Sequence, residues 1–343
     1  MSDMIKVENL VEVYPDGTRA VDGISFSVKE GEFFGFLGPN GAGKSTTIKV
    51  LTTLLEKTSG DVTLAGYDVE TQSKEIRKVI GVQSQDTIID DDLTGRENLM
   101  LQGHLHRMRG KALEQRVNEL LSLVGLSDVA DNKASYYSGG MKKRLDLAST
   151  LVHKPKLLFL DEPTLGLDPQ ARAGIWKYLF EINKTHGVTI FLTTQYIEEA
   201  DKLCNRLAII DRAQIIISGT PAALKQQVGG DTITITLAAG STNGDFKEKS
   251  KKIASSVKGV TKVLDIEGGV AAYANHAGQV IPDLVRVFDD NKIPLASISF
   301  SSPSLDDVFL QQTGRRIRPE ELQKRPSYSL GHNQKRRRKM PFH

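Results

Sequence analysis

A glycine-rich segment, Gly38 to Thr46 (GPNGAGKST), constrains the fold of this 343-residue chain more than any other feature. It fits the pattern G-x-x-x-x-G-K-[ST], follows the apolar run Phe33 to Leu37 and precedes the helical sequence STTIKVLTTLL. A strand, a loop and a helix in this order turn backbone N–H groups toward an anion at the helix N-terminus. The sequence therefore predicts a phosphate-binding loop in an α/β domain.

Two residues of this loop carry most of its chemistry. Lys44 would neutralise the β and γ phosphates of a nucleotide, and the Ser45 hydroxyl would be a ligand of Mg²⁺. The rest of the loop is expected to surround the same phosphates: Gly38, Pro39, Asn40, Gly41, Ala42, Gly43 and Thr46. A glycine-rich turn with a solvated lysine is the alternative, but the complete motif in its strand and helix context favours nucleotide binding.

A second candidate is the segment Leu157 to Pro163 (LLFLDEP), in which an apolar strand ends in two carboxylates. Ligands of α/β sheets lie at the carboxyl ends of strands, and successive strand side chains point to opposite faces. Asp161 would hold Mg²⁺ through its water shell, while Glu162 would polarise the attacking water as general base. Alone, such a turn is typical of a solvated loop. Its pairing with the phosphate loop favours catalysis.

The order of apolar runs predicts two folded units and a tail. Residues 1–228 alternate strand and helix patterns, which is typical of α/β layers around a largely parallel sheet, with a helical insertion at about 87–149. Residues 229–314 follow the order βαββαβ of a small α+β, ferredoxin-like domain and end in the helical SLDDVFLQQ. Residues 315–343 lose apolar periodicity and are expected to form a mobile basic tail.

Composition limits the setting in which the chain works. With 39% hydrophobic and 25% charged residues, disorder over most of its length is excluded. The single cysteine, Cys204, excludes an internal disulfide and favours a reducing cytosol. No window approaches 18 uninterrupted apolar residues, so we expect any membrane role to require a partner chain.

The net charge of +3 is the sum of two unlike parts. From Arg315 onward ten Lys or Arg face Glu320 and Glu321, so the tail contributes +8 and residues 1–314 sum to −5. We expect the tail to face anionic lipid, an expectation that removal of residues 315–343 tests through salt-sensitive membrane association.

A third segment, Tyr137 to Arg144 (YSGGMKKR), completes a set of motifs that resembles one family. From about Ile5 to Ser218 the chain is similar to the nucleotide-binding subunits of ATP-binding-cassette (ABC) transporters, whose signature is usually LSGGQ. The positions of Ser138, Gly139 and Gly140 match that signature, while Tyr137 and Met141 replace the commoner residues. A serine and two glycines at a helix start offer a hydroxyl and N–H groups to an anion. In the family this anion is the γ-phosphate held by the other subunit of a dimer.

The resemblance also assigns roles to single residues. Tyr14 matches the aromatic residue that stacks on adenine, and Asp168 matches the loop that contacts the opposite subunit. Gln85 matches the glutamine that senses Mg²⁺ and the γ-phosphate. Gln83 lies two positions earlier, and the spacing from Gly81 favours Gln85.

One position departs from the family pattern. Gln195 stands where the family normally has a histidine that contacts the γ-phosphate. An amide can donate a hydrogen bond to a phosphate oxygen, but it cannot accept and return a proton as imidazole does. The departure therefore favours Glu162 as the base and leaves Gln195 a positioning role.

Gln195, the sequence GLDP and the segment PSLDDVFLQQTGR together resemble the daunorubicin-resistance type of exporter ATPase. This resemblance implies ATP and Mg²⁺ as ligands and an ATP-sandwiched homodimer. It also implies a separate transmembrane permease whose cytosolic helices press into a groove beside Gln85. The chain would then be peripheral, at the cytoplasmic face of the membrane, and would energise efflux of a drug-like or amphipathic compound. The C-terminal unit would serve dimer contact or regulation, or only add buried area.

The competing function is a soluble ATPase that acts on nucleic acid or ribosomes, and the basic tail KRRRK is its only support. Chromosome-maintenance members of the superfamily insert a long coiled coil between the two motifs, whereas Lys44 and Ser138 are 94 positions apart. Translation-associated members carry two cassettes, whereas GKST and SGG each occur once. A regulator that binds nucleotide without hydrolysis is disfavoured by Glu162. Nucleic acid is therefore not the expected partner.

Overall fold

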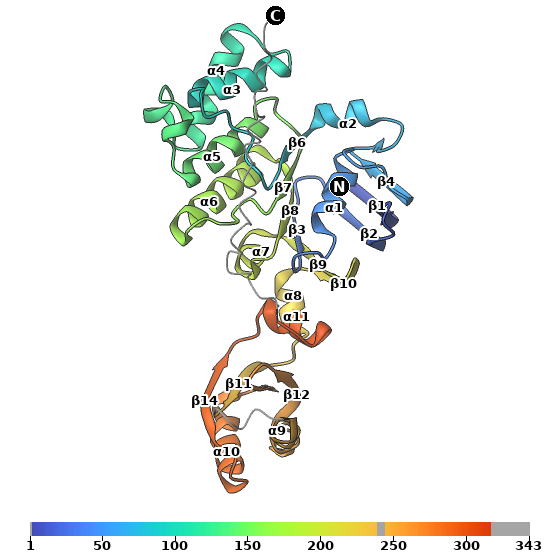
Figure 1. The fold of residues 1–343 in the computed structure, drawn as a ribbon, viewed down its shortest axis with the longest axis vertical. Helices are drawn as coiled ribbons and strands as arrows, with labels where there is room; N and C mark the ends of the chain where they lie inside the picture. The colour runs from blue at the N-terminus through green and yellow to red at the C-terminus, as the bar shows by residue number, and fades with distance from the viewer. Residues whose placement is uncertain (1, 239–243, 317–343) are drawn as a thin grey trace, which may run out of the picture.

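The computed structural model describes residues 2–238 and 244–316. Within these ranges the strands form three sheets, and Figure 1 shows two of them side by side in the upper part of the molecule and the third below. Of the predicted basic tail at 315–343, residues 317–343 lie outside the described residues.

The central sheet has the strand order β10-β9-β3-β8-β7-β6. Its strands are β3 (Phe33–Leu37), β6 (Ile80–Gln83), β7 (Leu157–Asp161), β8 (Thr189–Thr194), β9 (Arg206–Asp211) and β10 (Gln214–Gly219). All neighbours are parallel except β10, which runs antiparallel to β9. Every residue of β3, β7 and β8 is buried, because both faces of a parallel sheet are covered. The prediction of a largely parallel sheet is confirmed.

A second sheet of order β2-β1-β4-β5 lies beside the first. Its strands are β1 (Asp3–Val13), β2 (Arg19–Lys29), β4 (Ser59–Leu64) and β5 (Tyr67–Asp68). The helices α1 (Lys44–Leu51) and α2 (Ser73–Val79) lie on the same side of the molecule as this second sheet (Figure 1). The ring of Phe26 in β2 lies within 5.9 Å of the rings of Phe34, Phe36 and Phe191. This aromatic cluster joins the two sheets in one core.

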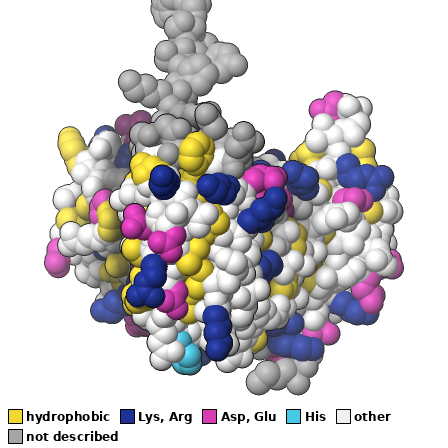
Figure 2. Space-filling view, turned by 90° about the horizontal axis from the view of Figure 1, so that it is seen from below, with side chains coloured by type: hydrophobic (Ala, Val, Ile, Leu, Met, Phe, Trp, Pro, Cys, Tyr) yellow, Lys and Arg dark blue, Asp and Glu magenta, His cyan; other side chains and the backbone are white. Residues whose placement is uncertain are grey.

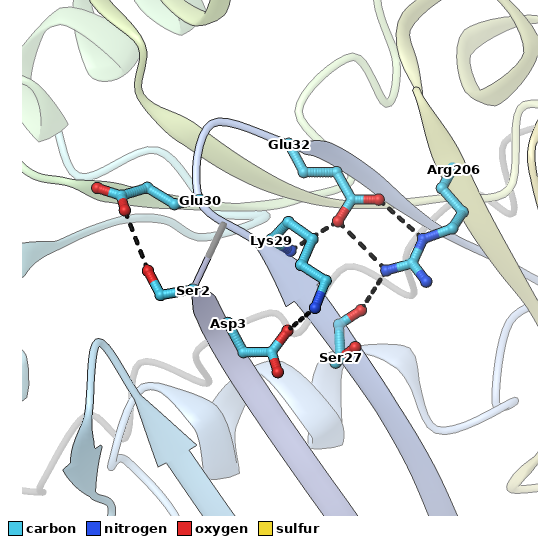
Figure 3. Close-up of polar contacts among 7 residues, drawn as sticks. All are labelled: Ser2, Asp3, Ser27, Lys29, Glu30, Glu32 and Arg206. Atoms are coloured by element: carbon cyan, nitrogen blue, oxygen red, sulfur yellow. Dashed lines mark hydrogen bonds and ion pairs between the residues drawn. The ribbon is translucent and has the colours of Figure 1, made fainter.

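Polar contacts of Arg206 also connect the same two sheets near the start of β3 (Figure 3). The Arg206 Nε donates to Glu32 Oε1 at 2.8 Å, and its Nη2 donates to the Ser27 carbonyl. Within the second sheet, the Lys29 ammonium of β2 pairs with Asp3 of β1 at 2.7 Å. These contacts lie at the end of β3 opposite the phosphate loop, so their role is structural.

The predicted insertion contains the helices α3 (Gly95–Leu105), α4 (Gly110–Leu123) and α5 (Gly139–Thr150) with short 3₁₀ turns at Ser127–Val129 and Ala134–Tyr136. Figure 1 shows these helices gathered on the side of the central strands opposite β1 and β2. A capping box of Thr94 and Glu97 starts α3. The helices α6 (Pro169–His186), α7 (Ile197–Leu203) and α8 (Pro221–Gln226) follow the central strands.

The lower part of the molecule is an antiparallel sheet of order β12-β13-β11-β14 with two helices. In chain order its elements are β11 (Asp231–Leu237), α9 (Gly244–Ser256), β12 (Val260–Ile266), β13 (Gly269–Ala274), α10 (Ala277–Asp290) and β14 (Leu295–Ser301). The side chains of Ile233, Leu284 and Phe288 belong to its buried core. Figure 2 views this end of the molecule and shows basic, acidic and hydrophobic side chains interspersed.

The last helix, α11 (Leu305–Thr313), returns to the upper part of the molecule. Its Phe309 is 1% exposed and shares a hydrophobic core with Leu224 of α8 and Tyr273 of β13. Arg315, which the sequence assigned to the tail, pairs with Asp211 of β9 at 2.7 Å. Within the described residues, no helix is both long and apolar enough to span a bilayer.

Candidate functional site

The loop between β3 and α1 passes so close to its neighbours that two of its positions admit only glycine. A Cβ at Gly38 would lie 2.2 Å from the carbonyl oxygen of Ile210, and one at Gly43 would lie 2.3 Å from that of Ala20. Gly43 also has a φ of +103°, which L side chains rarely adopt. The glycines of the motif are therefore required by the path of the backbone.

Lys44 is the buried cation of this loop, with only 4% of its surface exposed. Its Nζ donates to the carbonyls of Gly38 (2.8 Å) and Pro39 (3.0 Å) and forms an ion pair with Glu162 Oε1 at 3.1 Å. The fold thus brings together Lys44, the predicted phosphate ligand, and Glu162, the predicted general base, which lie far apart in the sequence. A phosphate that enters the loop meets an ammonium with a carboxylate directly beside it.

Ser45 and Asp161 are likewise adjacent. The Ser45 hydroxyl donates to Asp161 Oδ1 at 3.1 Å, and the Thr193 hydroxyl of β8 donates to the same oxygen at 2.6 Å. Hydroxyl, carboxylate and phosphate oxygens are the ligands that Mg²⁺ takes in nucleotide sites. The donor set therefore fits a Mg²⁺ ion held by Ser45 and Asp161 beside bound phosphate.

Glu162 occupies an unusual backbone position. Its φ is +50°, and its N–H donates to the carbonyl (3.1 Å) and hydroxyl (3.3 Å) of Thr193. A non-glycine residue in the left-handed region costs free energy and persists only where its surroundings hold it. Residue type predicted Glu162 as a candidate, but no sequence signal indicated this strained conformation.

A cavity of about 470 Å³ lies in front of the loop. The predicted residues that line it are Tyr14, Asn40, Gly41, Gly43, Lys44, Ser45, Thr46, Gln85 and Glu162. The side chains of Thr18, Arg19 and Ala20 also line it, and sequence reasoning missed them because only the fold brings β2 beside the loop. The hydroxyls of Tyr14 and Thr46 lie 3.1 Å apart.

The two neighbouring glutamines have different surroundings. Gln85 is exposed and lines the cavity. Gln83 is 2% exposed, donates to Asp146 at 3.1 Å and does not line the cavity. Lys143 of α5 donates to the Gln85 carbonyl at 2.7 Å. Gln85 is thus the residue of the two that can reach a nucleotide, and its backbone is tied to α5.

The signature residues lie at a second cavity, of about 330 Å³. Ser138 caps α5, where its hydroxyl accepts from the Met141 N–H at 3.2 Å, and Asp168 caps α6. Ser138, Gly140 and Asp168 line this cavity, Gly139 begins α5, and the two cavities have no lining residue in common. Within one chain the structure therefore does not bring Ser138 and Asp168 to Lys44.

Two departures from the family pattern can be located. The ring of Tyr137 is 6% exposed and its hydroxyl donates to the Val129 carbonyl at 2.6 Å, while burial raises the pKa of that hydroxyl. Gln195 follows β8, is 4% exposed and is not among the lining residues of the loop cavity. Tyr137 is thus a packing residue, and Gln195 is a buried residue outside the lining of the loop cavity.

Two family models match the chain. The model described as "ABC transporter" matches residues 21–165, and the model described as "ATP-binding protein DrrA1-3-like, C-terminal domain" matches residues 219–313. The second match covers the lower sheet and α11.

Relatives match along almost the whole chain. The daunorubicin resistance ATP-binding protein DrrA2 of Streptomyces coeruleorubidus is 40% identical over 87% of this chain and 91% of its own length. The linearmycin resistance ATP-binding protein LnrL of Bacillus subtilis is 39% identical over 92% of this chain and all of its own length. The Nod factor export ATP-binding protein I of Sinorhizobium fredii is 36% identical over 92% and 87%.

Solved structures show the same fold. The cbiO1 protein of Clostridium perfringens, part of an ABC transporter complex, superposes with a TM-score of 0.62 at 30% identity over 66% of this chain and 92% of its own. The ATP-binding cassette MJ0796, in a dimeric post-hydrolysis state with ADP and phosphate, gives 0.58 at 27% identity over 63% and 98%. The predicted nucleotide-binding fold is confirmed.

A phosphate loop, an acidic strand end and a signature helix on this fold define an ATP-binding subunit of an ABC transporter, and the chain belongs to that family. Within the family it belongs to the daunorubicin-resistance type, on the evidence of its 40% identity to DrrA2 and of the match of its C-terminal residues 219–313. It is therefore an ATPase that binds ATP and works with a membrane permease.

Proposed function

We propose that ATP hydrolysis by this chain energises the export of a drug-like or amphipathic compound through a separate membrane subunit. The observation that carries this proposal is the 40% identity to a daunorubicin resistance ATP-binding protein over 87% of the chain. The relatives are named for different compounds, so the compound itself depends on the permease. Action on nucleic acid or ribosomes receives no support from these relatives.

Hydrolysis would begin with an exchange of partners at Lys44. In the structure its ammonium donates to the carbonyls of Gly38 and Pro39 and forms an ion pair with Glu162. Phosphate oxygens would compete with the Glu162 carboxylate for this cation, because both are anions within reach of one ammonium. Glu162 is then free to accept a proton from water as the water oxygen bonds to the γ-phosphorus, and the bond to ADP breaks.

The other predicted residues would bind and orient. Ser45, Asp161 and Gln85 would hold Mg²⁺, which supplies neutralisation of the phosphate charge when bound. Tyr14 would stack on adenine, since its side chain is an aromatic ring and the residue lines the loop cavity. Gln195 would donate its amide to a phosphate oxygen and leave the proton transfer to Glu162.

A complete site would need two copies of the chain. Lys44 and Ser138 line separate cavities of one chain, and the similar MJ0796 cassette is dimeric in its post-hydrolysis state. A head-to-tail pair would bring Ser138, Gly139 and Gly140 of one copy to the phosphates held by Lys44 of the other, with Asp168 at the contact. Binding would close this dimer and hydrolysis would open it.

The permease would contact the insertion beside Gln85. Leu101 (44% exposed) and Leu105 (69% exposed) lie one turn apart on α3, so they share a face, and Ile88 follows the Gln85 segment with 60% exposed. Exposed apolar side chains of this size are typical of a surface that a partner covers. The chain would thereby be held at the cytoplasmic side of the membrane as a peripheral subunit.

The role of Glu162 is tested by Glu162→Gln. We expect ATP turnover to fall by about 10²-fold or more, because the amide cannot take the proton from water. Binding of ATP should persist, since Lys44 and the loop are unchanged. Measurement of turnover and of nucleotide binding on the same preparation separates the two effects, and Glu181→Gln on the exposed face of α6 is the matched control. Turnover at the wild-type rate would show that Glu162 is not the base.

Export is tested in cells that express the chain with its permease. We expect resistance to a transported compound with the wild-type chain and with Glu181→Gln, and sensitivity with Glu162→Gln. Equal resistance with and without an active Glu162 would contradict the proposal that this ATPase drives export.

A further inference from the structure

A buried carboxyl lies outside both cavities, in the first turn of α7. The side chain of Glu199 is 0% exposed. Its Oε1 accepts two hydrogen bonds of 2.9 Å each, from the Thr164 hydroxyl and from the Trp176 indole N–H. Thr164 is 0% exposed and Trp176 9% exposed, so water has little access to these bonds. One oxygen thus joins α7 to the loop after β7 and to α6.

Burial of the Glu199 carboxyl costs free energy, because the group loses its hydration. Among the described residues no Lys or Arg forms an ion pair with Glu199, whereas its neighbour Glu198 is exposed and pairs with Lys202 at 2.7 Å. Burial raises the pKa of Glu199, against the hydrogen bonds from Thr194, Trp176 and Thr164. An apolar side chain would fill this space without the desolvation cost. The hydrogen bonds are therefore the feature that distinguishes a carboxyl from an apolar residue here.

The joined segments are those that carry the candidate catalytic residues. Thr164 lies two positions after Glu162, and the Leu165 N–H donates to the Glu162 carbonyl at 3.1 Å. On the other side, α7 begins two positions after Gln195. The Thr164 to Glu199 bond thus connects the loop of Glu162 to the helix that follows Gln195.

The strained backbone of Glu162 depends on contacts such as the bond between Thr164 and Glu199. A φ of +50° persists only if neighbouring contacts hold it. Upstream, the Glu162 N–H is held by Thr193 of β8. Downstream, the side chain of Thr164 is held by Glu199. The loop that presents the Glu162 carboxylate to the cavity is therefore held on both sides of the strained residue.

We propose that Glu199 is a positioning residue for ATP hydrolysis: through Thr164 it fixes the Glu162 loop against the Gln195 segment. This inference rests on the roles that the proposed function gives to Glu162 and Gln195. Because neither Glu199 nor Thr164 lines the loop cavity, removal of their bond displaces the base without removing contacts to the nucleotide.

The test compares Glu199→Ala, Glu199→Gln and Glu198→Ala. We expect Glu199→Ala to lower kcat by about 10- to 100-fold with KM for ATP within about twofold, as for a base displaced by a fraction of an ångström to 1 Å. Glu199→Gln should restore most of kcat, because its amide oxygen can accept both hydrogen bonds. Glu198→Ala, which removes an exposed carboxylate one position earlier, should leave kcat and KM unchanged.

Thr164→Val keeps the test valid where Glu199→Ala fails to fold. It removes one of the two bonds and leaves Glu199 in place. We expect the same loss of kcat at unchanged KM, and no further loss when Thr164→Val is combined with Glu199→Ala, because both act through one contact. Thermal unfolding of each variant identifies a general loss of fold.

Three results would overturn the inference: wild-type kcat in a folded Glu199→Ala variant, no recovery in Glu199→Gln, or additive losses in the double variant. A failure of the proposed function is distinguishable, because wild-type protein would then hydrolyse no ATP or Glu162→Gln would hydrolyse it normally. Full turnover in Glu199→Ala beside a dead Glu162→Gln rejects only the role of Glu199.

Discussion

At the scale of single residues, the site depends on backbone positions as much as on side chains. The motif predicted Lys44, Ser45, Asp161 and Glu162 by residue type and spacing, and the fold places them within 3.1 Å of one another in two pairs. It could not predict the left-handed backbone of Glu162, which depends on contacts with β8. The roles assigned to these residues stay predictions.

Gln195 is the residue whose role differs most from the family pattern. We predict that Gln195→Ala lowers ATP turnover by about tenfold, as expected for loss of one hydrogen bond to a charged phosphate group. Nucleotide binding should change little, because Lys44 and the rest of the phosphate loop are unchanged. Steady-state turnover and equilibrium binding of ATP check this together. Unchanged turnover would exclude Gln195 from the mechanism, and Gln195→His is the informative companion because it restores the family residue.

At the scale of elements, the sequence predicted individual strands and helices, but it did not predict which elements pack against each other. The apolar runs within β3, β7 and β8 require burial on both faces, so the sequence predicts their place in a parallel sheet. The nine residues of α11 show a capped helix, but nothing in them indicates that Phe309 packs with α8. Such a contact is decided by the fold of residues far apart in sequence, and the unit boundary at 229–314 stays a prediction.

A stacked pair of histidines joins α3 to the segment after α5. The rings of His106 and His153 lie 3.8 Å apart and nearly parallel, and His153 Nε2 lies 2.8 Å from the Ile80 carbonyl of β6. Burial lowers the pKa of His153, and the positive charge of Arg116 on α4 acts in the same direction. Burial lowers the pKa of His106 as well. The folded state therefore binds protons less readily here than the unfolded state.

This difference predicts acid sensitivity. Because the pKa is lower in the folded state, stability from this pair is present above the unfolded value of about 6.5 and is lost as pH falls below it. We expect the urea midpoint of the wild-type chain to decrease from pH 7 to pH 5, and to decrease less in His153→Asn. His186→Asn, which changes an exposed histidine at the end of α6, is the control. Equal acid sensitivity in wild type and His153→Asn would contradict the account.

At the scale of the whole molecule, one chain holds two incomplete halves of a nucleotide site. The sequence predicted both motifs, the phosphate loop around Lys44 and the signature around Ser138. The resemblance to ABC subunits predicted that the two motifs meet only between copies of the chain. The structure of one chain shows the separation of the Lys44 and Ser138 cavities, and it does not show their meeting. The role of the basic tail stays a prediction for a different reason, because residues 317–343 lie outside the described residues.

The composite site is tested most directly by the mass of the protein in solution with ATP. Glu162→Gln should bind ATP without hydrolysing it and should sediment at twice the chain mass of 37.7 kDa. Adding Ser138→Arg should leave ATP binding intact, because Lys44 and the loop are unchanged, and should return the protein to 37.7 kDa. A Glu162→Gln protein that stays monomeric with bound ATP, or a double variant that still dimerises, would contradict a site shared between Lys44 of one copy and Ser138 of the other.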